Sequence, residues 1–421
     1  MSVVYGFGDG EVRLKECRSR VTRALGALMS APNRDRYAEM RLHAALGAAT
    51  AESTEMDTAF TNALAIAESL GDVEYQLRAL GGLYFLHAFS SQQRAAQPFA
   101  QRFSDLAAGG SDVGARLFGE HILGIGKHLL GDQTGARHQL EQLLTHQVPA
   151  WQGQDVVRFQ INGHMSARAF LARVLWLQGF ADQAVRVAET SIEEARATGH
   201  ALSLCYALSL AACPIAVWVG NLATAARYGD MVVDTSRRHD LALWGAYGSR
   251  FQMAVALMGG DIVRESRLLG TSPEDVAQSD LSFRSFTGLI QVVELLVHTG
   301  RMAEGLTLLA EIEQFDAGFY APELLRLKGE LALSRGTRAA AETAAGLFTK
   351  AFDEARRQGA LSWELRAATS LARLLRDQGR HADATACLQP VYDRFTEGFG
   401  TADLIAAKQL LDIAETLSRH G

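Results

Sequence analysis

The sequence has little of what metal clusters and disulfide frameworks need. Only 4 of its 421 residues are cysteine, and they are scattered without the Cys-x-x-Cys spacing of zinc or redox sites. Reduced thiols in apolar helical patterns suit a reducing compartment. The N-terminus also lacks a basic segment followed by an apolar run, so no secretion signal is predicted. We therefore expect a cytoplasmic location.

A concentrated basic surface is also missing. The net charge is −6, with 41 Lys and Arg residues interleaved among 47 Asp and Glu residues. Nucleic acid backbones are bound by clustered positive charge. We therefore expect no direct nucleic acid partner.

Catalytic and cofactor motifs are absent as well. The sequence has no Gly-x-Ser-x-Gly elbow and no HExxH pair, and its 12 histidines form no cluster at metal-ligand spacing. The string GIGKH around Lys127 lacks the first glycine and the final Ser or Thr of a nucleotide loop. We expect no enzyme activity, no cofactor and no metal. A catalytic site assembled from distant residues in a folded groove is the less favoured alternative.

Helix formers and a long repeat dominate what is present. Ala, Leu, Arg, Glu and Gln are abundant, only 7 residues are proline, and long β-branched runs are scarce. Short glycine or polar turns recur about every 40 residues, which is the period of a helix pair. These turns lie near Ala51, Ser91, Gly131, Gly179, Gly220, Gly260, Gly300, Gly336 and Gly379.

Small residues at fixed offsets from the turns support the helix pairs. In tetratricopeptide pairs, a small residue on each helix lets the other approach closely. Seven residues before four turns stand Gly124, Ala172, Cys213 and Ala372, and five residues after them stand Ala136, Ala184, Ala225 and Ala384.

The predicted fold is all-α, a tetratricopeptide-like helix-pair solenoid with a right-handed superhelix of about nine repeats. The predicted organisation is a lead-in helix within 1–35, a repeat array over 36–400 and a C-terminal capping helix within 401–421. The predicted pairs cover 36–71, 73–109, 113–147, 159–199, 201–239, 242–270, 283–315, 321–359 and 361–397.

One uncharged stretch, from Ala201 to Ala226, is long enough to span a bilayer. It contains Pro214 and Asn221, lacks flanks rich in Lys and Arg, and falls in step with the repeat. A buried inner helix is therefore favoured over a membrane span.

The first helices of the pairs should line the inner face of the solenoid, where two segments combine arginine with aromatic or amide side chains. Such combinations hold anionic or planar groups through paired donors and stacking, although inter-repeat hydrogen bonds and core packing also explain them. The candidate binding residues are Arg158, Gln160, Asn162, His164, Arg168, Trp244, Tyr247 and Arg250. Trp151, Trp176, Trp218 and Trp363 are expected to be packing residues.

Several strings resemble a known family, among them LAIAESLGDVEYQLRAL, ARAFLARVLWLQGFADQA and RRQGALSWELRAATSLARLLRDQGR. They are similar to the C-terminal tetratricopeptide region of bacterial signal-transduction ATPases, in which a winged-helix or nucleotide-cyclase domain and an AAA-type ATPase precede the repeats. The resemblance implies a sensor arm that binds an inducer or partner. The sequence has no Walker motifs and no winged helix, so ATP hydrolysis and DNA binding are not carried over.

The predicted function is a non-catalytic regulatory module of a transcriptional regulator. Its concave face would bind a protein, a peptide or a small inducer. Either the chain is a truncated or split member of the similar family, or an AAA-type ATPase or winged-helix effector lies on another chain. A free-standing interaction scaffold is the alternative.

Overall fold

The computed structural model describes residues 10–50, 53–90, 92–146, 158–159, 161–239, 241–259, 290, 293–294, 296–297, 300–313 and 316–420. Within these ranges every regular element is helical and no strand occurs. Most successive helices pack against each other along the chain. The predicted all-α fold of tetratricopeptide-like helix pairs is therefore confirmed.

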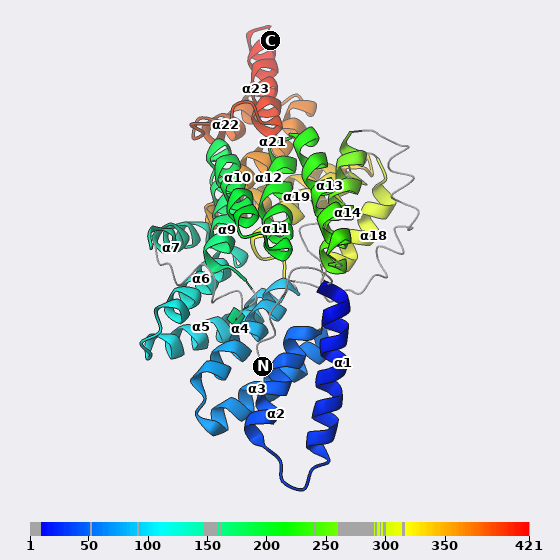
Figure 1. Cartoon of the computed structure of the whole chain (residues 1–421). Coiled ribbons are helices and arrows are strands. Elements are labelled where there is room, and N and C mark those ends of the chain that lie inside the picture. The colour runs from blue at the N-terminus through cyan, green and yellow to red at the C-terminus, as the bar shows by residue number, and fades with distance from the viewer. Residues whose placement is uncertain are drawn as a thin grey trace.

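Five helix pairs and a lead-in helix make up the N-terminal and central parts (Figure 1). The lead-in helix is α1 (Gly10–Met29). The first helix of the fifth pair has three parts, because a π-helical turn, η2, joins α11 to α12. The pairs are α2 (Arg36–Ala49) with α3 (Ser53–Leu70), α4 (Val73–Phe89) with α5 (Gln93–Ala108), α6 (Val113–Leu129) with α7 (Gln133–Thr145), α9 (Gly163–Leu177) with α10 (Ala181–Ala197), and α11 (Ala201–Ala207), η2 (Leu208–Ala212) and α12 (Cys213–Trp218) with α13 (Leu222–Arg238).

The remaining described elements follow the same order towards the C-terminus. They are α14 (Ala242–Met258), α18 (Met302–Ile312), the 3-10 turn η4 (Gly318–Tyr320), α19 (Ala321–Leu333) with α20 (Arg338–Gln358), α21 (Leu361–Asp377) with α22 (His381–Tyr392), and α23 (Ala402–His420). In Figure 1, α23 projects from the end of the molecule opposite to α1 and α2. The predicted pairs over 242–270 and 283–315 lie partly outside the described residues.

Local chemistry explains where the helices begin and end. Asp112 and Asp132 cap α6 and α7, because their side chains accept hydrogen bonds from backbone N–H groups of the first turns. The turns between paired helices use backbone with positive φ, for example 94° at Gly131 and 90° at Gly179. Only glycine adopts this conformation without strain, which is why the turns could be found in the sequence.

The small residues predicted at the helix contacts are buried between the paired helices. Ala172, Ala184 and Ala225 have no exposed surface. At Gly124 on α6, an added Cβ atom would lie 3.0 Å from Leu140 Cδ2 on α7, which is closer than an ordinary contact. The predicted register of the helix pairs is therefore confirmed at these positions.

Gly124→Leu is expected to lower the free energy of unfolding by about 1–3 kcal/mol, because the added side chain must displace Leu140. Gly346→Leu is the matched control, since an added Cβ atom there meets no atom within 4 Å on the exposed face of α20. Thermal melting of both variants tests the register. Equal melting temperatures for the two variants would show that α6 and α7 do not meet at Gly124.

The apolar stretch that could span a bilayer is a core segment in this structure. Residues Ala201–Trp218 have a mean hydropathy of 1.8, and 83% of them are buried inside the protein. The π-helical turn interrupts this segment just before Pro214, which lacks a backbone N–H for an α-helical hydrogen bond. This is the one described helix that is long and apolar enough to cross a membrane.

The C-terminal repeats pack against the middle of the chain. Trp363 at the start of α21 contacts Trp176 and Trp218, with ring centroids 4.9 and 5.9 Å apart. The backbone N–H of Gln183 donates to Glu397 Oε1 at 2.9 Å across the same junction. Trp176, Trp218 and Trp363 are at most 2% exposed, so their predicted role in packing is confirmed, while Trp151 lies outside the described residues.

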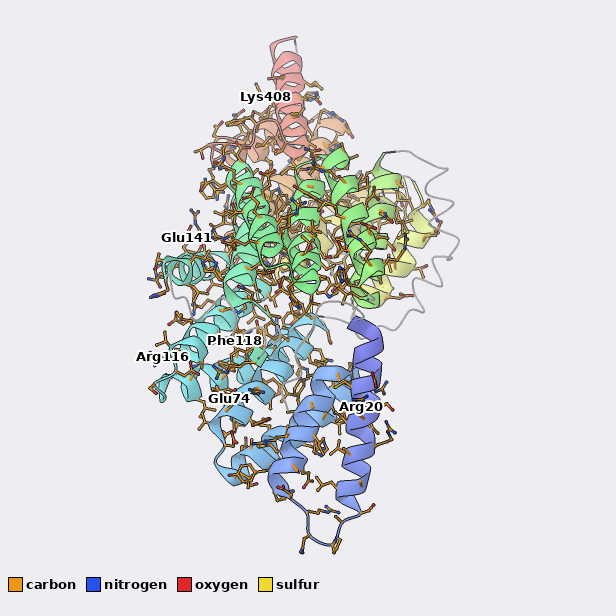
Figure 2. All side chains as sticks on the ribbon, viewed as in Figure 1. Arg20, Glu74, Arg116, Phe118, Glu141 and Lys408 are labelled. Carbon is orange, nitrogen blue, oxygen red and sulfur yellow. The ribbon has the colours of Figure 1, made fainter. Side chains whose placement is uncertain are left out.

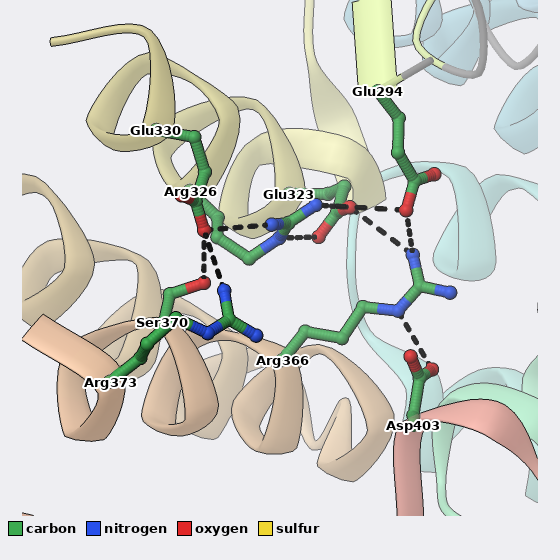
Figure 3. A network of polar contacts seen from close by, with 8 residues as sticks. All are labelled: Glu294, Glu323, Arg326, Glu330, Arg366, Ser370, Arg373 and Asp403. Carbon is green, nitrogen blue, oxygen red and sulfur yellow. Dashed lines mark hydrogen bonds and ion pairs between the residues drawn. The ribbon is translucent and has the colours of Figure 1, made fainter. Parts of the chain in front are cut away.

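A buried ion network joins the C-terminal helices (Figure 3). Arg366 on α21 contacts Glu294 and Glu323 through Nη1 at 3.0 and 3.2 Å, and Asp403 on α23 through Nε at 2.8 Å. Glu323 on α19 is 1% exposed and also contacts Arg326 Nη2 at 2.6 Å. These ion pairs connect α19, α21 and α23, so the C-terminal region is fixed by charges as well as by apolar packing.

Candidate functional site

A large groove opens between the N-terminal helices and the central helices. We call it the N-terminal groove. Its volume is about 1140 Å³, and most of its lining comes from the N-terminal helices α1, α2 and α4 together with residues 158–165, α11 and α14. Except for α1 and two side chains of α3, the helices that line it are the first helices of their pairs. The groove therefore lies on the inner face of the repeat array, as the pattern predicts for a binding surface.

Aromatic and aliphatic side chains cover most of the groove wall. Phe85 and Phe89 on α4 stack with nearly parallel rings, 5.8 Å apart, at the N-terminal side. On the central side, Trp244 and Tyr247 of α14 lie 5.6 Å apart. Further apolar or aromatic lining residues are Tyr37, Leu42, Met56, Tyr75, Leu86, Phe159, Ile161, Met165, Leu202, Tyr206 and Leu210.

Two glycines shape the groove floor around Phe60 of α3. An added Cβ atom at Gly47 on α2 would lie 2.9 Å from the Phe60 ring, and one at Gly82 on α4 would lie 2.5 Å from it. The ring therefore occupies the space that side chains at these positions would need. It fills the floor between α2 and α4 and is itself 5% exposed.

The charged lining is mainly positive, in a chain whose net charge is −6. Four arginines line the groove from three helices and the segment before α9, against only two acids, Glu16 and Asp35. The arginines are Arg20, Arg41, Arg78 and Arg158. Figure 2 shows Arg20 on α1 and Glu74, the partner of two other arginines, on α4.

Arg158 fixes the segment before α9 to the N-terminal repeats. Its Nε donates to Glu74 Oε1 at 3.0 Å and its Nη1 donates to Asp112 Oδ2 at 2.7 Å. Arg78 Nε donates to the same Glu74 oxygen at 2.8 Å. Burial alone would raise the pKa of Glu74, but hydrogen bonds and positive charge from Arg158 and Arg78 hold it below its ordinary value. Arg78 and Arg158 line the groove, whereas Glu74 and Asp112 are not among its lining residues.

The two acids of the lining already have partners. Glu16 pairs with Arg20 one helical turn away. Asp35 caps α2 by accepting hydrogen bonds from the N–H groups of Tyr37 and Ala38. Arg41, by contrast, is exposed on α2 and pairs with no carboxylate in the described part of the chain. The groove therefore has cationic capacity that the described residues do not use.

The central wall is held by a buried hydroxyl pair. Tyr206 of α11 lines the groove, and its hydroxyl lies 2.7 Å from Ser166 Oγ on α9. Ser166 has no exposed surface, so this hydrogen bond is protected from water. It fixes the Tyr206 ring against α9.

The structure separates the eight candidate binding residues into groups. Arg158, Trp244 and Tyr247 lie together in the lining of the N-terminal groove. Asn162 caps α9 by accepting a hydrogen bond from the N–H of Met165, so its oxygen already has a structural role. The binding role of these residues stays a prediction.

His164 and Arg168 lie on α9 outside the groove lining, where both contact Glu194 of α10, at 3.5 and 2.9 Å. Gln160 and the side chain of Arg250 lie outside the described residues.

Further lining residues that were not predicted from the sequence are Arg41, Arg78, Phe85 and Phe89. A usable signal was present, because α4 carries apolar residues around most of its circumference. A helix with that pattern packs on more than one side. Gln76 also lies two residues before Arg78, the same spacing that separates Arg158 from Gln160.

Metal-ligand clusters are absent from the described residues, and the two buried cysteines, Cys205 and Cys213, are poorly reactive. No group of three or more His, Cys, Asp or Glu side chains among them could hold a metal ion. Burial raises the pKa of the Cys205 thiol to about 12 and that of Cys213 further still, so neither forms a reactive thiolate near neutral pH.

Comparisons with known proteins find similar structures but no related sequence. No protein-family model and no curated protein matches the chain. Yeast Tom70 aligns with a TM-score of 0.40 and 11% identity, over 97% of this chain and 86% of Tom70. A Rap protein in complex with competence and sporulation factor aligns with a TM-score of 0.46 and 12% identity, over 96% of this chain and 95% of the Rap protein. A circular tandem repeat protein aligns with a TM-score of 0.18 and 14% identity, over 97% of this chain and 90% of that protein. At these scores the fold assignment depends on the helix pairs of the chain itself.

Proposed function

We propose that the chain is a non-catalytic, cytoplasmic regulatory module that binds a peptide segment of a partner protein in the N-terminal groove. The observation that carries this proposal is the composition of the groove lining, which combines stacked aromatic rings with four arginines, of which Arg41 has no carboxylate partner among the described residues. Aromatic and arginine side chains are enriched where proteins bind one another.

The dimensions of the groove favour a peptide over a small inducer. Small-molecule sites enclose about 300–1,000 Å³ and bury most of their ligand. The N-terminal groove has a volume of about 1140 Å³ and two walls formed by different repeats, so it suits a longer ligand. A small inducer remains the narrower alternative within the same site.

The regulatory context is proposed from the sequence resemblance. The similar bacterial proteins couple their repeats to an AAA-type ATPase with a winged-helix or cyclase domain. In that arrangement, peptide binding in the groove would control an ATPase effector on another chain.

An assembly scaffold is a second candidate, and it is favoured by apolar side chains at the other end of the molecule. Phe399, Ile405 and Ile413 are 50%, 45% and 46% exposed on and beside α23. A scaffold would use that end, whereas the proposed module uses the groove.

Filling the groove tests the proposal. Ala45 on α2 is half-buried in the groove lining, so Ala45→Trp places an indole in the open space. Peptides selected from a random display library on the unmodified protein should bind this variant at least about tenfold more weakly, which is measurable by fluorescence anisotropy.

Ala406→Trp on the exposed face of α23 is the control and should bind the selected peptides normally. Thermal melting shows whether both variants are folded. Undiminished binding to Ala45→Trp would place the peptide site elsewhere, and binding lost only in Ala406→Trp would favour the scaffold.

A further inference from the structure

We propose that the occupant of the N-terminal groove is an amphipathic α-helix with an acidic face, contributed by a partner protein. This inference rests on the proposed function, because it specifies the ligand of the same groove. Three properties of the described lining lead to it: the scarcity of groups that could pair with an extended backbone, the volume, and the charge.

The polar side chains of the lining favour a helical ligand. An extended peptide exposes one N–H and one C=O per residue, and each needs a partner when it is buried. Side-chain amides serve this purpose well because they both donate and accept. Among the described lining residues there is no Asn and no Gln. Arginine only donates, and the side-chain oxygens of Asp35, Ser203 and Tyr206 in the lining already have hydrogen-bond partners, so few acceptors are left for the N–H groups of an extended chain.

An α-helix removes this difficulty because its backbone groups pair within the helix. It then presents side chains to the groove, and apolar residues at positions i, i+3, i+4 and i+7 form one stripe. The stripe fits a lining that contains Phe85 and Phe89 of α4 as well as Trp244 of α14. A helical ligand is thus compatible with a mostly apolar lining.

The volume agrees with a short helical segment. A helix about 10 Å across, rising 1.5 Å per residue, fills roughly the volume of the groove over about ten residues. The groove has a volume of about 1140 Å³. The docked segment should therefore make two to three turns.

The charge of the lining selects the polar face of that helix. Arg41 is exposed and has no carboxylate partner among the described residues, while Glu16 and Asp35 are already paired or capping. Arg78 and Arg158 keep their carboxylate partners outside the lining. A ligand carboxylate would meet Arg41 without displacing an existing ion pair, whereas a basic ligand would face like charge.

The experiment uses the peptides selected on the full chain. The enriched peptides are expected to be acidic and to carry apolar residues at helical spacing. The tightest peptide should lose affinity at least about tenfold when a central residue is replaced by proline, because proline breaks the helix. It should lose a similar factor against Arg41→Glu, whereas Arg41→Lys should retain most of the affinity.

Arg338→Glu is the matched charge control. Arg338 is 94% exposed on α20, outside the groove lining, so its reversal changes the net charge equally without altering the site. Affinity for this variant should stay within about twofold of the unmodified protein at physiological salt, where distant charges are screened.

The outcomes separate the two proposals. Selected peptides that are neutral or basic, that tolerate central proline, or that bind Arg41→Glu and Arg338→Glu equally would overturn the acidic helix. If those peptides were still blocked by Ala45→Trp, the proposed function would stand. Failure to select any peptide would overturn both.

Discussion

Arg366→Met is expected to lower the free energy of unfolding by about 3 kcal/mol. The guanidinium is 11% exposed and contacts carboxylates of Glu294, Glu323 and Asp403. Its removal leaves acidic groups in a poorly solvated site, and breaking such a buried pair costs about 3–5 kcal/mol. The low end of this range applies because Glu323 keeps its contact with Arg326.

Urea denaturation at neutral pH, followed by tryptophan fluorescence, measures this loss. The fluorescence is informative because the Arg366 guanidinium lies 5.5 and 5.1 Å from the ring centres of Trp176 and Trp363. The signal therefore reports on the junction between the central and C-terminal repeats.

Arg373→Met on the same helix is the control. Its side chain is 49% exposed and makes one long ion pair with Glu330, at 3.9 Å. We expect a change within about 0.5 kcal/mol there, since exposed ion pairs add little stability. Equal losses in the two variants would mean that the network does not stabilise the fold beyond an ordinary surface pair.

The repeat could be predicted from sequence because its signals are local. Glycines such as Gly131 and Gly179 mark turns that need positive φ, and alanines such as Ala184 mark contacts within one helix pair. Each signal depends on residues fewer than 40 positions apart, so period and register were readable.

The contact between the C-terminal and central repeats could not be predicted in this way. Trp176 and Trp363 each look like an ordinary core residue of their own helix, and nothing local shows that their rings meet. The same holds for Arg366, whose partners include Glu294 and Asp403 from distant helices. The rotation accumulated over several repeats brings such residues together, and a periodic sequence does not specify that rotation.

The candidate site was predictable only in part for a related reason. An aromatic or amide neighbour beside arginine selected Arg158 and Trp244, which line the groove, and their binding role stays a prediction. The same rule selected Arg168, whose position on α9 directs it to Glu194 instead. Which face of a helix remains open depends on the neighbouring repeats, so composition alone cannot separate these cases.

Acidification is expected to destabilise the protein strongly well before most of its carboxylates are protonated. His121 and His128 on α6 are fully buried, and burial lowers the pKa of each from 6.5 to about 3, with the positive charge of Arg173 adding to the effect at His128. The unfolded chain therefore binds protons at these residues below about pH 6.5, while the folded chain does not. Each residue then costs about 1.4 kcal/mol of stability per pH unit.

The pH window follows from the direction of these shifts. The stability that the neutral histidines contribute is complete above pH 6.5 and is lost as the pH falls from 6.5 towards 3. At pH 4.5 the two residues together should reduce the free energy of unfolding by about 5 kcal/mol. Glu74, Glu194 and Glu323 have pKa values lowered from 4.5, so the stability that they contribute is lost mainly below about pH 4.5. Partly buried His43 and His200 act in the same direction as the two histidines, since burial lowers the pKa of each.

His121→Phe separates this effect from general acid denaturation. Neither ring nitrogen of His121 has a hydrogen-bond partner among the described residues. The ring centroids of His121 and Phe118 are 5.4 Å apart, so an apolar ring fits the site. Between about pH 6.5 and 4.5, the free energy of unfolding of the variant should fall less steeply than that of the unmodified protein, by about 1.4 kcal/mol per pH unit. Urea titrations at a series of pH values measure this slope. His138→Gln, at an exposed position on α7, should leave the slope unchanged. An unchanged slope in His121→Phe would mean that α6 takes up the proton in the folded state, and that this core opens before the rest of the array unfolds.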